Sequence, residues 1–137
     1  MNAASGCNLP RWAGRYAAVV GAMDFCTGVA LVAAPALTLG LMGAQAPAVE
    51  SLGLVRLVGV FVGAVGAGYL MAAGGPLAGL RAVLGSTLLV RAGVGTFTGF
   101  AVASGWFDRG WLVVAATDLG CAAVQAWMLA RKEDKHA

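Results

Sequence analysis

The sequence predicts an all-α integral membrane protein, a four-helix bundle with both termini in the cytoplasm. Two features of its composition predict this class. Hydrophobic residues make up 60% of the 137 residues and charged residues only 11%, whereas soluble domains carry about 25% charged residues. The mean hydropathy is +0.83. A water-soluble protein of this size could not cover its surface with so few charges.

The third observation is a set of four apolar stretches, each long enough to cross a bilayer core, which takes about 20 helical residues. They lack the period-2 alternation of barrel strands, so helices are the predicted spanning form. We expect one four-span domain over residues 1–137, ending in a charged cytoplasmic tail at residues 131–137. The predicted spans are about 12–34, 52–73, 80–104 and 110–130.

Proline and glycine separate the first elements. The first span ends at Pro35, and the second ends at the run Gly74, Gly75 and Pro76. The longest connector, residues 35–51, is mostly apolar and contains four large apolar residues near its start. Two interpretations remain open for it: a segment that rests on the outer membrane interface, or an ordinary loop packed over the helix ends.

Basic residues predict the orientation. Six of them flank the cytoplasmic side of the predicted spans: Arg11, Arg15, Arg81, Arg131, Lys132 and Lys135. Only Arg109 and Arg56 belong to the other side, and positively charged loops stay inside. We therefore expect a multi-pass protein of a bacterial inner membrane with cytoplasmic termini. The net charge of +3 reflects this orientation, and without a basic stripe between aromatics we expect no nucleic-acid binding.

Four charged residues fall inside the predicted spans, one in each: Asp24, Arg56, Arg91 and Asp118. Each unpaired charge near a helix centre costs about 2.5–3.5 kcal/mol. A helical rise of about 1.5 Å per residue allows all four to meet in the outer half of the bundle. Two acids and two bases would cancel, and depth favours the pairs Asp24–Arg56 and Arg91–Asp118.

Glycine shares a helix face with the charge in three of the four spans. Small residues let helix backbones approach closely in a membrane. The predicted packing glycines are Gly59, Gly63, Gly66, Gly95 and Gly99. In the fourth span, Asp118 aligns with Cys121 and Gln125 instead. The charges therefore lie on the predicted inward faces.

Ligands for a tightly held cofactor are missing from the sequence. The one histidine is His136, in the tail, and the three cysteines form no CxxC pair. We therefore expect no haem, no metal site and no catalytic residues, and only a quinone or a lipid as a possible bound molecule.

Short motifs in the second, third and fourth spans carry a resemblance to a known group. The second span contains Arg56-Leu57-Val58-Gly59 and then Gly66-Ala67-Gly68-Tyr69-Leu70, the third contains Arg91, and the fourth contains Asp118. Over residues 12–130 the chain resembles the DoxX-like superfamily of small four-helix membrane proteins. The resemblance implies a relation to a membrane subunit of thiosulfate:quinone oxidoreductase or to accessory partners of redox or assembly systems. It implies no catalytic residues.

Three functions remain open at this stage. The first is an accessory or assembly subunit of a larger membrane complex, such as a quinone-linked redox complex, in which the charges act as a structural clasp. The second is a binding protein or an enzyme for a hydrophobic ligand such as a quinone or an isoprenoid, held at Asp24, Arg56, Arg91 and Asp118. The third is a small carrier or channel, which would need a continuous polar path through the membrane.

Overall fold

The computed structural model describes residues 9–131, which fold into α-helices and two short 3-10 helices without any strand in that range. The elements, in chain order, are α1 (Ala13–Ala33), α2 (Pro35–Leu41), η1 (Val49–Ser51), α3 (Leu52–Ala73), α4 (Leu77–Ala103), η2 (Arg109–Trp111) and α5 (Leu112–Ala130). The all-helical prediction is confirmed. Cys7, His136 and the tail beyond Arg131 lie outside the described residues.

Four of the helices, α1, α3, α4 and α5, are long and apolar enough to cross a membrane. Their bounds lie close to the predicted spans, and the largest difference is at the start of α4. This helix begins at Leu77, three residues before the expected start, because Pro76 serves as its N-cap in an extended conformation. Proline fixes the backbone there and lets a helix begin directly after it.

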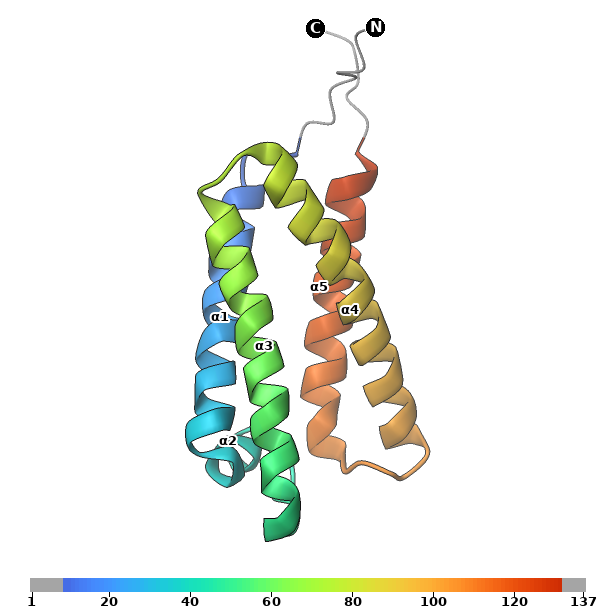
Figure 1. Cartoon of the computed structure of the whole chain (residues 1–137). Coiled ribbons are helices and arrows are strands. Elements are labelled where there is room, and N and C mark those ends of the chain that lie inside the picture. Colours follow the sequence, from blue (N-terminus) through green and yellow to red (C-terminus); the bar gives the residue numbers. More distant parts are fainter. Residues whose placement is uncertain (1–8, 132–137) are drawn as a thin grey trace, which may run out of the picture.

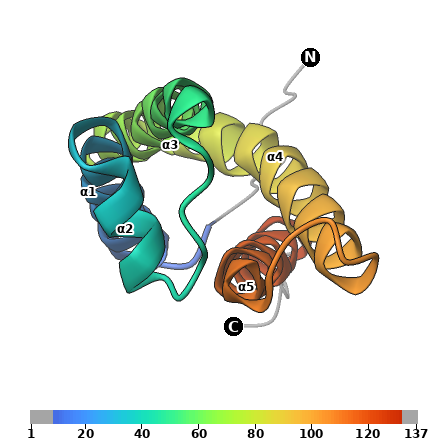
Figure 2. The same cartoon turned by 90° about the horizontal axis from the view of Figure 1, so that it is seen from below.

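The long helices pack in two pairs, α1 with α3 and α4 with α5 (Figures 1 and 2). The start of α1 and the end of α5 lie at the same end of the molecule, which we call the terminal end (Figure 1). The opposite end carries α2, η1 and η2, and we call it the loop end (Figure 1). Contacts between the pairs are sparse compared with those inside each pair.

Close packing of α1 on α3 depends on glycine. A Cβ atom added to Gly21 would lie 2.7 Å from Tyr69 Cβ, and one added to Gly66 would lie 2.7 Å from the Gly21 carbonyl oxygen. One added to Gly59 would lie 2.8 Å from Leu31 Cβ. Real side chains do not fit at such distances, so the two backbones touch here as in small-xxx-small helix pairs.

Two predicted packing glycines have room for a side chain of their own. A Cβ added to Gly63 would be 3.8 Å from Gly28 Cα, and one added to Gly99 would be 3.9 Å from Ala115 Cβ. Both are ordinary van der Waals distances, so an alanine fits at either position. Opposite Gly63, it is Gly28 of α1 that has no room: a Cβ atom added to Gly28 would meet the backbone of Gly63 on α3. Between α4 and α5, Gly95 is the tight position, at 2.8 Å from Leu119 Cγ.

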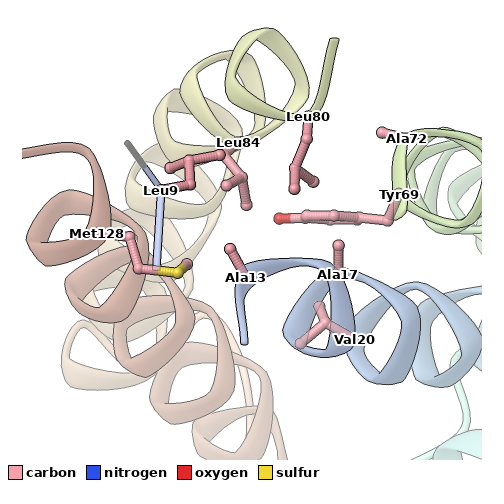
Figure 3. Packing of buried hydrophobic residues seen from close by; sticks show 9 residues of the cluster. All are labelled: Leu9, Ala13, Ala17, Val20, Tyr69, Ala72, Leu80, Leu84 and Met128. Carbon is pink, nitrogen blue, oxygen red and sulfur yellow. The ribbon is translucent and has the colours of Figure 1, made fainter. Parts of the chain in front are cut away.

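An apolar cluster joins all four long helices at the terminal end (Figure 3). Tyr69 projects from α3 into it, and its ring lies among residues of the other helices (Figure 3). The buried members are Leu9, Ala13, Ala17, Val20, Tyr69, Ala72, Leu80, Leu84 and Met128. A second, smaller cluster at the loop end consists of Leu31, Leu39 and Ala44 with Val55 and Trp111 against it.

The 35–51 connector packs in part over the helix ends. Its first part is α2, which begins at Pro35 and buries Thr38 and Leu39 against the helix ends. On the other side of α2, Leu37 and Leu41 are 64% and 81% exposed. The connector therefore packs over the helices and also presents leucines outward.

The loop end joins the two helix pairs through Asp108. One carboxylate oxygen of Asp108 accepts a hydrogen bond from the Gln45 backbone N–H at 2.8 Å, and the other accepts from the Gly110 N–H at 2.8 Å. Gly110 packs directly on the backbone of Gly43, and the space left there admits no side chain. Gly43 itself has a φ of 76°, a conformation that favours glycine.

Candidate intramembrane polar site

Arg91 is the centre of a polar network at mid-height of the molecule. It lies on the inner face of α4, and its side chain is only 4% exposed. Nη1 donates to Asp118 Oδ1 on α5 at 2.5 Å, and Nη2 donates to Asp24 Oδ2 on α1. A single guanidinium therefore binds two carboxylates and joins three helices.

The third donor of Arg91 reaches α3. Its Nε donates to the Tyr69 hydroxyl at 3.2 Å, and its guanidinium carbon lies 5.5 Å from the centre of the tyrosine ring. The Gln125 side-chain amide contacts the same hydroxyl from α5 and donates to Thr87 Oγ1 at 3.4 Å. Arg91 and its ligands thus link α1, α3, α4 and α5, and the Tyr69 ring also belongs to the apolar cluster at the terminal end.

The structure corrects the expected position of Arg56. This residue lies on the exposed surface of α3 near the loop end. Its Nε donates to the carbonyl oxygen of Val32 at 3.2 Å. Val32 is in the last turn of α1, where carbonyl groups lack a helical partner and attract cations. The predicted Asp24–Arg56 pair is therefore wrong, whereas the Arg91–Asp118 pair is present.

The charge count of the site changes with this correction. Instead of a neutral set of two acids and two bases, two carboxylates share one guanidinium. The formal charge of the three ionised groups is −1. The carboxylate side chains remain slightly open, with 12% of Asp24 and 16% of Asp118 exposed.

Helical periodicity in the sequence predicts most residues of the polar network but not all of them. The first-span stripe of Ala17, Gly21, Asp24 and Gly28 is buried throughout. Tyr69 and Thr87 were not singled out as partners of the charges. Thr87 precedes Arg91 by four residues, one turn along the buried face of α4, so the same periodicity could have included it. Tyr69 follows Gly66 by three residues, so the periodicity also places these two residues on one face of α3.

Tyr16 forms a second link between α1 and α5. Its hydroxyl donates to the carbonyl oxygen of Cys121 at 3.3 Å. The Cys121 side chain is part-buried, the Cys26 side chain is exposed, and both thiols are free. Neither cysteine forms a disulfide within residues 9–131.

A shallow apolar groove runs along the outside of the α1–α3 contact. Small residues form its floor, because glycine brings the two backbones together there. Its lining residues are Phe25, Gly28, Val29, Val32, Ala33, Gly59, Val60, Gly63, Ala64 and Ala67. None of the charged residues of the network lines this groove, so it is a separate feature of the surface.

The described residues offer the chemistry of carboxylates, a guanidinium and a phenol. In residues 9–131 there is no group of three or more His, Cys, Asp or Glu side chains that could hold a metal ion. The arrangement can orient helices through charge-assisted hydrogen bonds, and it can exchange a proton or accept a hydrogen-bond donor at the open carboxylate oxygens.

No protein-family model, curated protein or solved structure matches this chain. The class of the protein therefore follows from its own features. Four helices of membrane-spanning length and composition make it a multi-pass membrane protein whose apolar helix surfaces contact the lipid bilayer.

Proposed function

We propose that this chain is an accessory or assembly subunit of a larger complex in a bacterial inner membrane. It would be a four-helix bundle with cytoplasmic termini. The observation that carries the proposal is the groove along α1 and α3, whose glycine and alanine floor is open outward. Such surfaces receive a further transmembrane helix in membrane assemblies, because the backbones can approach closely. A quinone-linked redox complex is the class of partner that the resemblance to DoxX-like proteins implies.

The orientation is supported by charge. The described arginines at the terminal end are Arg11, Arg15, Arg81 and Arg131, whereas Arg109 lies at the loop end. Because positive residues remain in the cytoplasm, the loop end would face the periplasm. A reporter fused to the carboxyl terminus tests this, since a reporter active only in the cytoplasm should be active.

The polar network fits a structural role in such a subunit. Arg91 bridges the two helix pairs, which make few direct contacts with each other. Buried polar groups that are bound on several sides fix the register of helices in lipid. The network would therefore keep the α1–α3 surface in a single orientation toward a partner.

The test is co-purification of the tagged full chain from native membranes after gentle crosslinking. Ala64→Leu adds a side chain in the groove, and it should reduce the recovery of partner subunits at least several-fold. Ala123→Leu adds the same volume on an exposed position of α5 and serves as the matched control. Purification of a lone monomer without any partner subunit would contradict the proposal, as would equal recovery with both variants.

A second candidate function is binding of a hydrophobic ligand at the polar network. The open carboxylate oxygens of Asp24 and Asp118 favour it, since a quinol or an isoprenoid alcohol could donate a hydrogen bond to them. Mass spectrometry of lipids that remain on the purified protein tests it. The expected result is a stoichiometric quinone or isoprenoid, which the Arg91→Gln variant should lose. A purified protein that carries only bulk phospholipid would exclude this function.

A further inference from the structure

The polar network carries more negative charge than its own residues neutralise. Arg91 is the one cation that contacts Asp24 or Asp118 among residues 9–131. All three of its nitrogen positions are engaged, with the two carboxylates and with Tyr69. A second positive charge from these residues is therefore not available to the carboxylates.

Other groups that face the cluster do not supply it. Tyr16 of α1 and Tyr69 of α3 carry no positive charge, and Cys121 of α5 contributes its backbone carbonyl to Tyr16. Arg56 is bound to the carbonyl of Val32 on the surface. The remaining arginines in residues 9–131 lie at the ends of the helices.

Each carboxylate of the network keeps an acceptor without a partner. One oxygen of each carboxylate, Asp24 Oδ1 and Asp118 Oδ2, receives no hydrogen bond from residues 9–131. In the same network, Gln125 is fully buried, and its Oε1 has no partner within that range. A hydrogen-bond donor would complete the carboxylates, and a donor with one positive charge would also balance the cluster.

We propose that the Asp24–Arg91–Asp118 cluster binds one exchangeable monovalent cation from outside the chain, either a proton on one of the two carboxyls or a small metal or ammonium ion against both. With a proton, an O–H bond forms at Asp24 or Asp118, and the other carboxylate stays paired with Arg91. The cluster is then neutral. This proposal rests on the cluster alone and holds whether or not the chain is an accessory subunit.

The exposure of the three side chains places the entrance on the carboxylate side. Arg91 is 4% exposed, whereas Asp24 and Asp118 are three to four times more open at 12% and 16%. The carboxylates are therefore the accessible part of the cluster. The guanidinium is buried behind them.

Infrared spectroscopy of the full chain in lipid nanodiscs tests the proton directly. The expected result at neutral pH is the C=O band of one protonated carboxyl, which disappears at alkaline pH. Either Asp24→Asn or Asp118→Asn should abolish the band, because the remaining carboxylate balances Arg91. Glu50→Gln makes the same chemical change at an exposed residue of η1 and should retain the band.

The ion alternative gives a different result in the same preparation. No protonated carboxyl is then seen, and the melting temperature rises when sodium, potassium or ammonium replaces a bulky organic cation at constant ionic strength. This dependence should vanish in either asparagine variant. Absence of the carboxyl band together with a melting temperature that is independent of these ions overturns the proposal, and both measurements are made on the wild-type chain.

Thermal unfolding of the variants gives an independent criterion. Each single asparagine variant should melt within a few degrees of the wild type, because asparagine replaces a carboxyl that is already neutralised. The double variant leaves Arg91 without an anion and should melt about 10 °C lower or more. If each single variant lowers the melting temperature by half of the loss in the double variant, both carboxylates are ionised and unbalanced, and the proposal is wrong.

Discussion

The contact between α1 and α3 and the junction between the two helix pairs are stabilised by different physics. Inside the α1–α3 pair, glycine lets the backbones touch, so the contact depends on the absence of side-chain volume. At the junction, Arg91 spans the distance between the pairs with hydrogen bonds to both sides. The first region should therefore tolerate no added methyl group at Gly21, Gly28, Gly59 or Gly66. The second should depend on Arg91 keeping an anionic partner.

The largest effect is expected at the junction. Arg91→Gln leaves Asp24 and Asp118 in a low-dielectric region without their cation, which should cost about 3–5 kcal/mol of unfolding free energy. Denaturant titration in detergent micelles measures it. Arg56→Gln is the control, because that arginine is exposed and contacts one carbonyl group, and its loss should stay below about 1 kcal/mol. Equal losses of unfolding free energy for both arginine variants would contradict a central role of Arg91 in stability.

Gly66→Ala tests the packed pair. The added methyl would meet the Phe25 backbone and the Gly21 carbonyl oxygen, so α3 must move away from α1. We expect a loss of about 2–3 kcal/mol, measured in the same titration. Gly63→Ala is the matched control on the same helix, where the methyl has room. It should leave the stability unchanged or raise it, since alanine is a better helix former by about 1 kcal/mol. Similar losses in both variants would show that close packing does not limit this contact.

Tyr69→Phe separates hydrogen bonding from packing in the network. The ring remains, but the hydroxyl that accepts from Arg91 Nε and contacts Gln125 is lost. Leaving these groups without a partner should cost about 1–3 kcal/mol. Tyr16→Phe removes a hydroxyl with a single, half-buried partner, and its effect should be smaller. The thermal unfolding curves of the two variants give the comparison, and the opposite order would contradict it.

The smallest effect is expected at the loop end. Asp108→Ala removes two hydrogen bonds, one of which joins the loops of the two pairs. Because this site is on the surface, the loss should be about 0.5–1 kcal/mol. Hydrogen exchange at the Gln45 amide should become faster, whereas Glu50→Ala should leave it unchanged. An unchanged exchange rate in the first variant would mean that the junction does not extend to this end.

Sequence reasoning placed the helices well because hydropathy and helix breakers act locally. Pro35 and the run before Leu77 end and begin helices through backbone constraints that need no knowledge of neighbours. It also placed Asp24, Arg91 and Asp118 on inward faces, since helical periodicity relates each charge to the small residues on its own helix.

Hydropathy and helical periodicity do not predict which side chain pairs with each charge. Depth in the membrane made Arg56 and Asp24 suitable partners, but depth does not say which way a side chain near a helix end turns. Arg56 instead donates a hydrogen bond to the carbonyl oxygen of Val32 at the end of α1. Gly63 and Gly99 follow the small-residue pattern but have room for a methyl group, and at Gly63 the position without room is Gly28 on the other helix. The pattern does not tell which of two facing glycines points its hydrogen at the partner backbone.

The sequence by itself determined the class, the four helices and the faces on which charge and glycine lie, because each depends on composition and on residues within a few turns of one another. Only the tertiary structure decided that Arg91 serves two aspartates, that Tyr69 and Gln125 join them, and that Arg56 does not. These relations depend on how four helices cross, and a difference of one turn in that crossing changes which side chains meet. The unbalanced charge at the centre of the protein follows from that crossing.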